Sequence, residues 1–102
     1  LAQRLLRAGE VAGERTWQLP LWQPYRDMVK SEIADVRNSA GRQGGAITAA
    51  AFLNTFVSEY PWAHLDIAGT AWTDSKPKAY QPKGATGVGV RLLLQALRDW
   101  TG

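Results

Sequence analysis

The side chains that could do metal or acid–base chemistry in this sequence gather around its single histidine. His64 and Asp66 are two residues apart in an alternating segment, so on a β-strand they would share one face about 7 Å apart. Asp35 would join them if its own segment formed the neighbouring strand. One imidazole and two carboxylates could hold a divalent metal ion or transfer a proton. The alternative is a hydrogen-bonded polar pair that stabilises strand ends.

A run of small residues follows this histidine. The segment 62–68 alternates between polar and apolar residues, as a half-buried strand does. The small residues Ala68 and Gly69 stand at its end, and the chain then continues to Trp72. Ligands in open α/β sheets bind where strands end, and small residues there leave room for a ligand to approach. The end of this predicted strand is therefore expected to form the edge of a functional site, with Trp72 as a candidate wall of the pocket.

Two glycine-rich loops, at residues 41–45 and 83–87, each open a predicted helix. Free amides at a helix amino end attract anions, so these loops could bind phosphate. Neither loop carries the Gly-Lys-Ser/Thr ending of a phosphate loop. Turn geometry and close helix packing are the favoured explanation of the glycines.

Helices and strands in alternation are expected to position these groups. Apolar periodicity, with glycines and prolines at the ends, predicts helices and strands. The expected helices are residues 1–12, 24–31, 45–59 and a last one from Val90 that ends before Gly102; the expected strands are 33–38 and 62–68, with a surface loop over 73–83. This order predicts a parallel βαβ unit. The fold class is therefore α/β: a βαβ-containing portion of a mixed central sheet flanked by helices, in an incomplete domain.

Composition limits the remaining function classes. The sequence has 102 residues, a net charge of +3 and no cysteine, which excludes thiol chemistry and disulfides. It shows no apolar run near the roughly 20 residues that span a bilayer, and no signal peptide. The scattered charges disfavour a nucleic-acid groove, although a basic module with the five tryptophans as stacking platforms remains the alternative function. The start at Leu1 within a helical pattern suggests a piece of a larger protein.

Five blocks of the sequence, in one order, carry a resemblance. They are GERTWQLPL (13–21), DVRN (35–38), GGAITAAAFL (44–53), WAHLDIAG (62–69) and KGATG (83–87). Together they closely resemble the carboxy-terminal region of the leucyl (cytosol) aminopeptidase family. Because several blocks in register cover nearly the whole chain, the signal is far more specific than a single glycine motif.

The resemblance implies a dinuclear metallo-exopeptidase that removes amino-terminal residues, leucine above all, from peptides. Two divalent cations, zinc, manganese or magnesium, would bind the free amine, polarise the scissile carbonyl and activate a bridging water. Family members are cytoplasmic homohexamers. The implied partners are therefore peptide substrates, the remainder of the catalytic domain and further copies of the enzyme, with no membrane.

The family's metal-binding motif Asn-Thr-Asp-Ala-Glu-Gly-Arg is absent from this sequence. We therefore expect residues 1–102 to be the carboxy-terminal segment of the catalytic domain, without metal ligands or catalytic residues and inactive alone. The resemblance places Ala68 and Ala71 on the pocket for the substrate's first side chain, and Ser39 beside the next substrate residue. Some relatives carry a larger residue at Ala71, so a wider pocket is expected. His64 and Asp66 then become structural.

Overall fold

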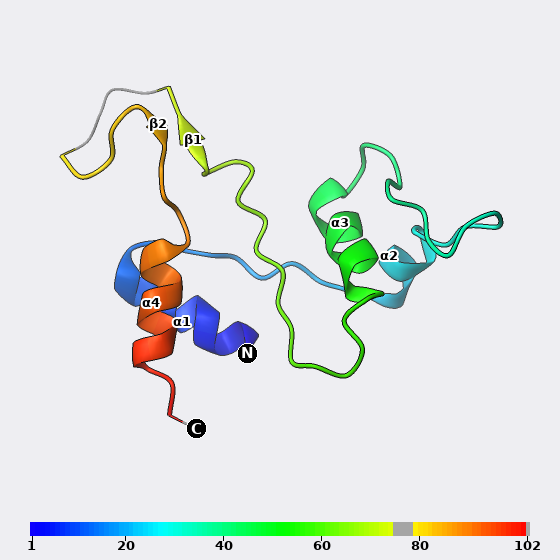
Figure 1. The fold of residues 1–102 in the computed structure, drawn as a ribbon, viewed down its shortest axis with the longest axis horizontal. Coiled ribbons are helices and arrows are strands. Elements are labelled where there is room, and N and C mark those ends of the chain that lie inside the picture. The colour runs from blue at the N-terminus through cyan, green and yellow to red at the C-terminus, as the bar shows by residue number, and fades with distance from the viewer. Residues whose placement is uncertain (75–78, 102) are drawn as a thin grey trace. The chain divides into compact units, whose positions relative to one another are not determined.

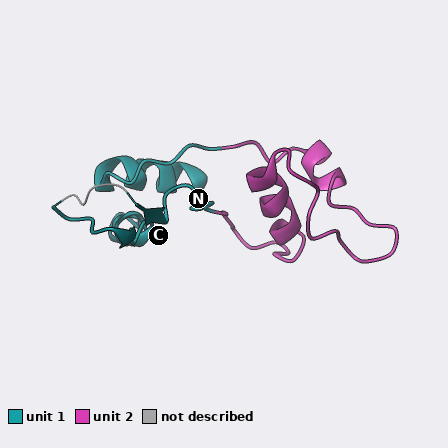
Figure 2. Cartoon of the chain, turned by 90° about the horizontal axis from the view of Figure 1, so that it is seen from above, with its two compact units in different colours: residues 1–18, 65–102 teal, residues 19–64 magenta. Residues whose placement is uncertain are grey.

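The computed structural model describes residues 1–74 and 79–101 (Figure 1). This part of the chain contains four helices and a two-stranded sheet. It divides into two compact units: unit 1 comprises Leu1–Gln18 and Leu65–Gly102, and unit 2 comprises Leu19–His64 (Figure 2). No helix within the described residues is long and apolar enough to cross a bilayer.

Unit 1 is built on the contact between its two helices, α1 (Ala2–Ala12) and α4 (Val90–Arg98). The buried residues of this contact are Leu5, Ala8 and Gly9 of α1 and Leu92 and Ala96 of α4. Small residues on both helices let the two backbones approach closely. Gly13, at φ 70°, adopts the left-handed conformation that ends α1.

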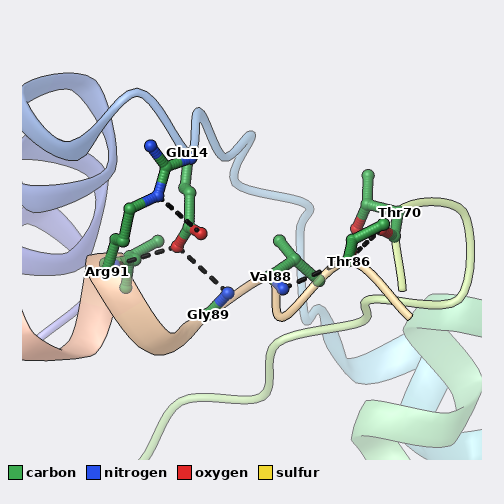
Figure 3. Close-up of polar contacts among 7 residues, drawn as sticks. Glu14, Thr70, Thr86, Val88, Gly89 and Arg91 are labelled. Carbon is green, nitrogen blue, oxygen red and sulfur yellow. Dashed lines mark hydrogen bonds and ion pairs between the residues drawn. The ribbon is translucent and has the colours of Figure 1, made fainter. Parts of the chain in front are cut away.

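The amino end of α4 is capped by a residue distant in the sequence. Its N-cap residue, Gly89, has no side chain to accept hydrogen bonds. The Glu14 carboxylate does so instead: Oε2 accepts from the amides of Gly89 (3.0 Å) and Leu92 (2.9 Å), and Oε1 accepts from Arg91 Nε (3.3 Å) (Figure 3). The negative charge also interacts favourably with the positive end of the helix dipole. Glu14 thus attaches α4 to the segment that follows α1.

The sheet is a short hairpin of β1 (Trp72–Thr73) and β2 (Gly84–Ala85). The strands are antiparallel, with Trp72 opposite Ala85 and Thr73 opposite Gly84. Gly84 has φ 109°, and a Cβ built on it would lie 3.7 Å from the Trp72 ring. The surface loop predicted over 73–83 therefore includes the end of β1, and its residues 75–78 lie outside the described residues.

Unit 2 holds α2 (Gln23–Asp27) and α3 (Gly45–Asn54). Pro24 lies in the first turn of α2, where its missing N–H has no helical partner to lose. Arg26 of α2 donates a hydrogen bond from its guanidinium to Oδ1 of Asn54 at the end of α3. The buried side chains of this unit are Val29, Thr48 and Ala51.

The four predicted helices are present, but two of them are shorter than predicted. The helix predicted over 24–31 ends at Asp27, and the one predicted over 45–59 ends at Asn54. Ser58 has φ 57°, a left-handed conformation that the helix cannot include. The helix predicted from Val90 ends at Arg98, and Gly102, expected to follow it, lies outside the described residues.

The two predicted strands are wrong for this structure. In the segment 33–38, Ser31 Oγ accepts hydrogen bonds from the amides of Ile33 (3.3 Å) and Ala34 (3.2 Å), which folds the chain into a local turn. The segment 62–68 forms no ladder within the described residues. The parallel βαβ unit is therefore not found in residues 1–74 and 79–101, and the observed sheet is antiparallel. The α/β class is confirmed, while the mixed central sheet stays a prediction.

Candidate functional site

The small residues after His64 lie on a compact turn in unit 1. The carbonyl of Ile67 accepts hydrogen bonds from the amides of Thr70 (2.9 Å) and Ala71 (2.8 Å) and from the Thr70 hydroxyl (3.2 Å). Before it, Asp66 Oδ1 accepts from the amide of Ala68 (2.9 Å). We call residues 67–71 the rim turn. The predicted exit of a strand is in fact this turn.

The rim turn presents small side chains to solvent. Ala68 and Gly69 are exposed and Ala71 is half-buried. A Cβ built on Gly69 would meet no atom within 4 Å. The turn therefore leaves open space beside Gly69. Its role as the edge of a site stays a prediction.

A second segment, residues 84–89, holds the rim turn from one side. The amide of Thr86 donates to the carbonyl of Ala71 (2.9 Å), and the Thr86 hydroxyl donates to the carbonyl of Thr70 (2.6 Å) (Figure 3). The hydroxyl oxygen in turn accepts from the amide of Val88 (3.3 Å). These contacts join the rim turn to the segment that leads into α4.

Trp72, predicted as a wall of the pocket, lies directly after the rim turn in β1. Its side chain is 64% exposed, and its indole N–H donates to Asp74 Oδ1 (3.4 Å). Its ring lies against Gly84 of the facing strand. The tryptophan is therefore part of the hairpin, and its role in a pocket stays a prediction.

The sequence left open a metal site built on Asp35, His64 and Asp66, of which the first two belong to unit 2 and the third to unit 1. The described residues, which include all three, contain no group of three or more His, Cys, Asp or Glu side chains that could hold a metal ion. The His64 ring stacks on that of Trp62, with 6.1 Å between centroids, and Asp66 accepts the hydrogen bond that opens the rim turn. Both residues thus have structural contacts, as the family resemblance implied.

Ser39 lies in unit 2, in the loop before α3. It is exposed, and its Oγ is 3.5 Å from the amide nitrogen of Gly41. The rim turn belongs to unit 1, so Ser39 and the rim turn lie in different units. The sequence-predicted site residues therefore fall into two groups: Ala68 and Ala71 on one turn, and Ser39 on a separate loop.

The glycines of the two loops have the backbone geometry that turns require. Gly41 and Gly44 have φ 97° and 62°, and Gly84 and Gly87 have φ 109° and 69°. These left-handed conformations are strained for other residues. This geometry agrees with the turn explanation of the glycines.

The sequence as a whole places the chain in a family. A profile of the cytosol aminopeptidase family, catalytic domain, matches residues 1–94. The chain belongs to the cytosol aminopeptidase family, which confirms the resemblance of its five blocks. This result does not favour the alternative of a standalone nucleic-acid-binding module.

Individual relatives agree with this assignment. A probable cytosol aminopeptidase of Roseiflexus castenholzii is 90% identical over 101 residues, which are 99% of this chain and 21% of that protein. One from Syntrophotalea carbinolica is 61% identical over 99 residues, which are 97% of this chain and 20% of that protein. The chain thus spans about a fifth of the length of the curated relatives it matches.

Two solved structures share the fold. The bottromycin maturation enzyme BotP, in complex with manganese, matches 95% of this chain and 22% of its own, with a TM-score of 0.87 and 47% identity. A mutant of tomato leucine aminopeptidase matches 96% of this chain and 19% of its own, with a TM-score of 0.82 and 42% identity. At these identities the likeness extends beyond the fold to the family.

Proposed function

We propose that residues 1–102 are the carboxy-terminal segment of the catalytic domain of a dinuclear, metal-dependent leucyl aminopeptidase. The enzyme would hydrolyse amino-terminal residues, with leucine preferred, from peptides. The family match over residues 1–94 and the likeness to a leucine aminopeptidase support this function.

In this proposal the segment supplies the rim of the substrate pocket. Ala68 and Ala71 would border the pocket for the first side chain of the substrate, and Ser39 would border the next residue. The observation that carries this role is the rim turn, in which the small residues Ala68 and Gly69 are exposed and a Cβ built on Gly69 would meet no atom within 4 Å. Burial of a leucyl side chain against such groups stabilises binding by about 1.5–3 kcal/mol.

The metal ions of the proposed enzyme, two zinc or manganese ions, would be bound outside this chain. The described residues do not fit a pair of divalent ions, because they offer no cluster of three suitable ligands. The manganese complex of BotP supports metal dependence in a relative. The segment's own contribution is then to shape the pocket, with no catalytic step performed by its residues.

The proposed partners are the remainder of the catalytic domain and, in a cytoplasmic homohexamer, further copies of the enzyme. Large apolar side chains support such partners, since extensive exposed apolar surface usually marks an interaction site. Among the described residues, Trp17 is 88% exposed, Phe56 64% and Leu97 69%. Other protein surfaces are expected to cover these side chains.

The test compares the chain alone with a chimera in which it replaces the matching 101 residues of the Roseiflexus castenholzii relative. Hydrolysis of leucine p-nitroanilide is measured with Mn²⁺ present, and the unaltered relative is the control. We expect activity from the chimera and none from the 102-residue chain. Activity of the chain alone, or a folded but inactive chimera beside an active relative, would contradict the proposal.

A further inference from the structure

The rim turn has no polar group on Ala68 or Ala71, and its Thr70 hydroxyl donates within the turn to the carbonyl of Ile67 (3.2 Å). Its internal hydrogen bonds close the turn around the carbonyl of Ile67 but do not fix its position in unit 1. Contacts from outside the turn must do this. Two of them come from Thr86, through its amide and its hydroxyl.

The hydroxyl of Thr86 joins two segments. It donates to the carbonyl of Thr70 at 2.6 Å and accepts from the amide of Val88 at 3.3 Å. Its hydrogen and one lone pair are therefore both in use. Of the two contacts, the short bond to Thr70 is the one that reaches the rim turn.

The segment that carries Thr86 is itself held in place at Gly89, three residues further along the chain. Glu14 accepts hydrogen bonds from the amides of Gly89 and Leu92, and only 7% of its side chain is exposed. A buried carboxylate with several donors resists displacement, because breaking these bonds would leave a poorly solvated charge. Glu14 thus anchors the amino end of α4, and Thr86 connects this anchored segment to the rim turn (Figure 3).

We propose that Thr86 is a positioning residue for substrate binding, whose hydroxyl sets the location of the rim turn and hence the width of the pocket beside Ala68 and Ala71. This inference rests on the proposed function. It assigns Thr86 a role in side-chain selectivity without any contact between Thr86 and the substrate.

The experiment measures KM and kcat of the chimera for leucine, alanine and phenylalanine p-nitroanilides. Thr86→Val removes the hydroxyl at nearly constant shape, and Thr86→Ser retains it. Loss of one hydrogen bond predicts a KM for the leucine substrate that is about three- to tenfold higher in Thr86→Val. We expect less than a twofold change in kcat and a weaker preference for leucine over alanine, with Thr86→Ser close to the unsubstituted chimera.

A matched control removes a similar hydroxyl elsewhere. Thr55 donates to the carbonyl of Ala51 (3.2 Å) in unit 2, so Thr55→Val should leave all three KM values unchanged. Hydrogen exchange adds a second measurement: the amide of Val88 should exchange faster in Thr86→Val, because its acceptor is gone. Exchange of the amides within α1 should not change.

The outcomes separate the inference from the function on which it rests. An inactive unsubstituted chimera overturns both. An active chimera whose KM values do not change in Thr86→Val overturns the positioning role alone, as does an equal KM increase in Thr86→Ser and Thr86→Val. If Thr86→Val does not fold, Thr86→Ala replaces it. If neither variant folds while Thr86→Ser is fully active, the Thr86 hydroxyl is required for folding, and the positioning role is overturned as well.

Discussion

Gly9 of α1 and the backbone oxygen of Glu14 lie so close that a methyl group on Gly9 does not fit between them. A Cβ built on Gly9 would be 3.2 Å from Leu92 Cδ1 and 2.6 Å from the backbone oxygen of Glu14. The Glu14 amide also donates to the Gly9 carbonyl (2.9 Å). The turn that follows α1 therefore depends on a glycine at this position, and it places Glu14 where its carboxylate caps α4.

The first prediction is that Gly9→Ala destabilises the chimera. Alanine favours a helix interior over glycine by up to about 1 kcal/mol, but here its methyl group must displace backbone. Overpacking of this kind costs about 1–3 kcal/mol, so a lower Tm is expected in thermal unfolding. The control is Gly45→Ala at the start of α3, where a Cβ would meet nothing within 4 Å and Tm should be unchanged or slightly higher. Equal effects of both substitutions would contradict the close-approach argument.

The second prediction concerns the Glu14 cap. Glu14→Gln replaces one carboxylate oxygen by an amide group that donates, so some of the donors of α4 lose their acceptor. We expect a loss of stability of about 1–2 kcal/mol, measured as a lower Tm of the chimera. Glu10→Gln changes the same charge at an exposed site on α1 and should have little effect. A similar loss in both variants would show that net charge, and not capping, is responsible.

The helices could be predicted because their determinants are local. Apolar spacing and flanking glycines place α1, α3 and α4 within a few residues of their observed amino ends. The strands could not, because a strand needs a hydrogen-bonded neighbour that an alternating pattern does not specify. Ile33, predicted to lie in a strand, is 99% exposed, since Ser31 provides a local turn instead.

The site was only partly predictable for a similar reason. The small residues Ala68 and Ala71 stand out in the sequence. Thr86, which donates to the carbonyl of Thr70 in the same turn, is 16 residues away from Thr70 and has no local pattern that reveals the contact. Glu14 is 75 residues from the amide of Gly89 that it caps. One signal was available: no Ser, Thr, Asp or Asn stands directly before Val90, so the cap of that helix had to come from elsewhere.

The third prediction is a pH effect in unit 2. Hydrogen bonds from Lys30, 2.7 Å away, and from Gln23 lower the pKa of Asp27 below its ordinary value. A carboxylate with a lowered pKa stabilises the folded state above its unfolded pKa, and this contribution is lost as the pH falls through the folded pKa. NMR titration of the chain should give a pKa for Asp27 that rises toward its ordinary value in Lys30→Met. An unchanged Asp27 pKa in that variant would show that Lys30 is not the cause.

The last prediction tests the width of the pocket. If Ala71 borders the space for the first side chain of the substrate, Ala71→Met fills part of that space. A bulky phenylalanine substrate should then lose about tenfold in kcat/KM relative to an alanine substrate, since a change of a few methylene groups in an apolar pocket alters discrimination by roughly 10- to 200-fold. The measurement is kcat/KM of the chimera for the two p-nitroanilides. Ala34→Met adds the same side chain at an exposed position in unit 2 and should leave the ratio unchanged. An unchanged ratio in Ala71→Met, with Tm and metal content retained, would remove Ala71 from the pocket while leaving the family assignment intact.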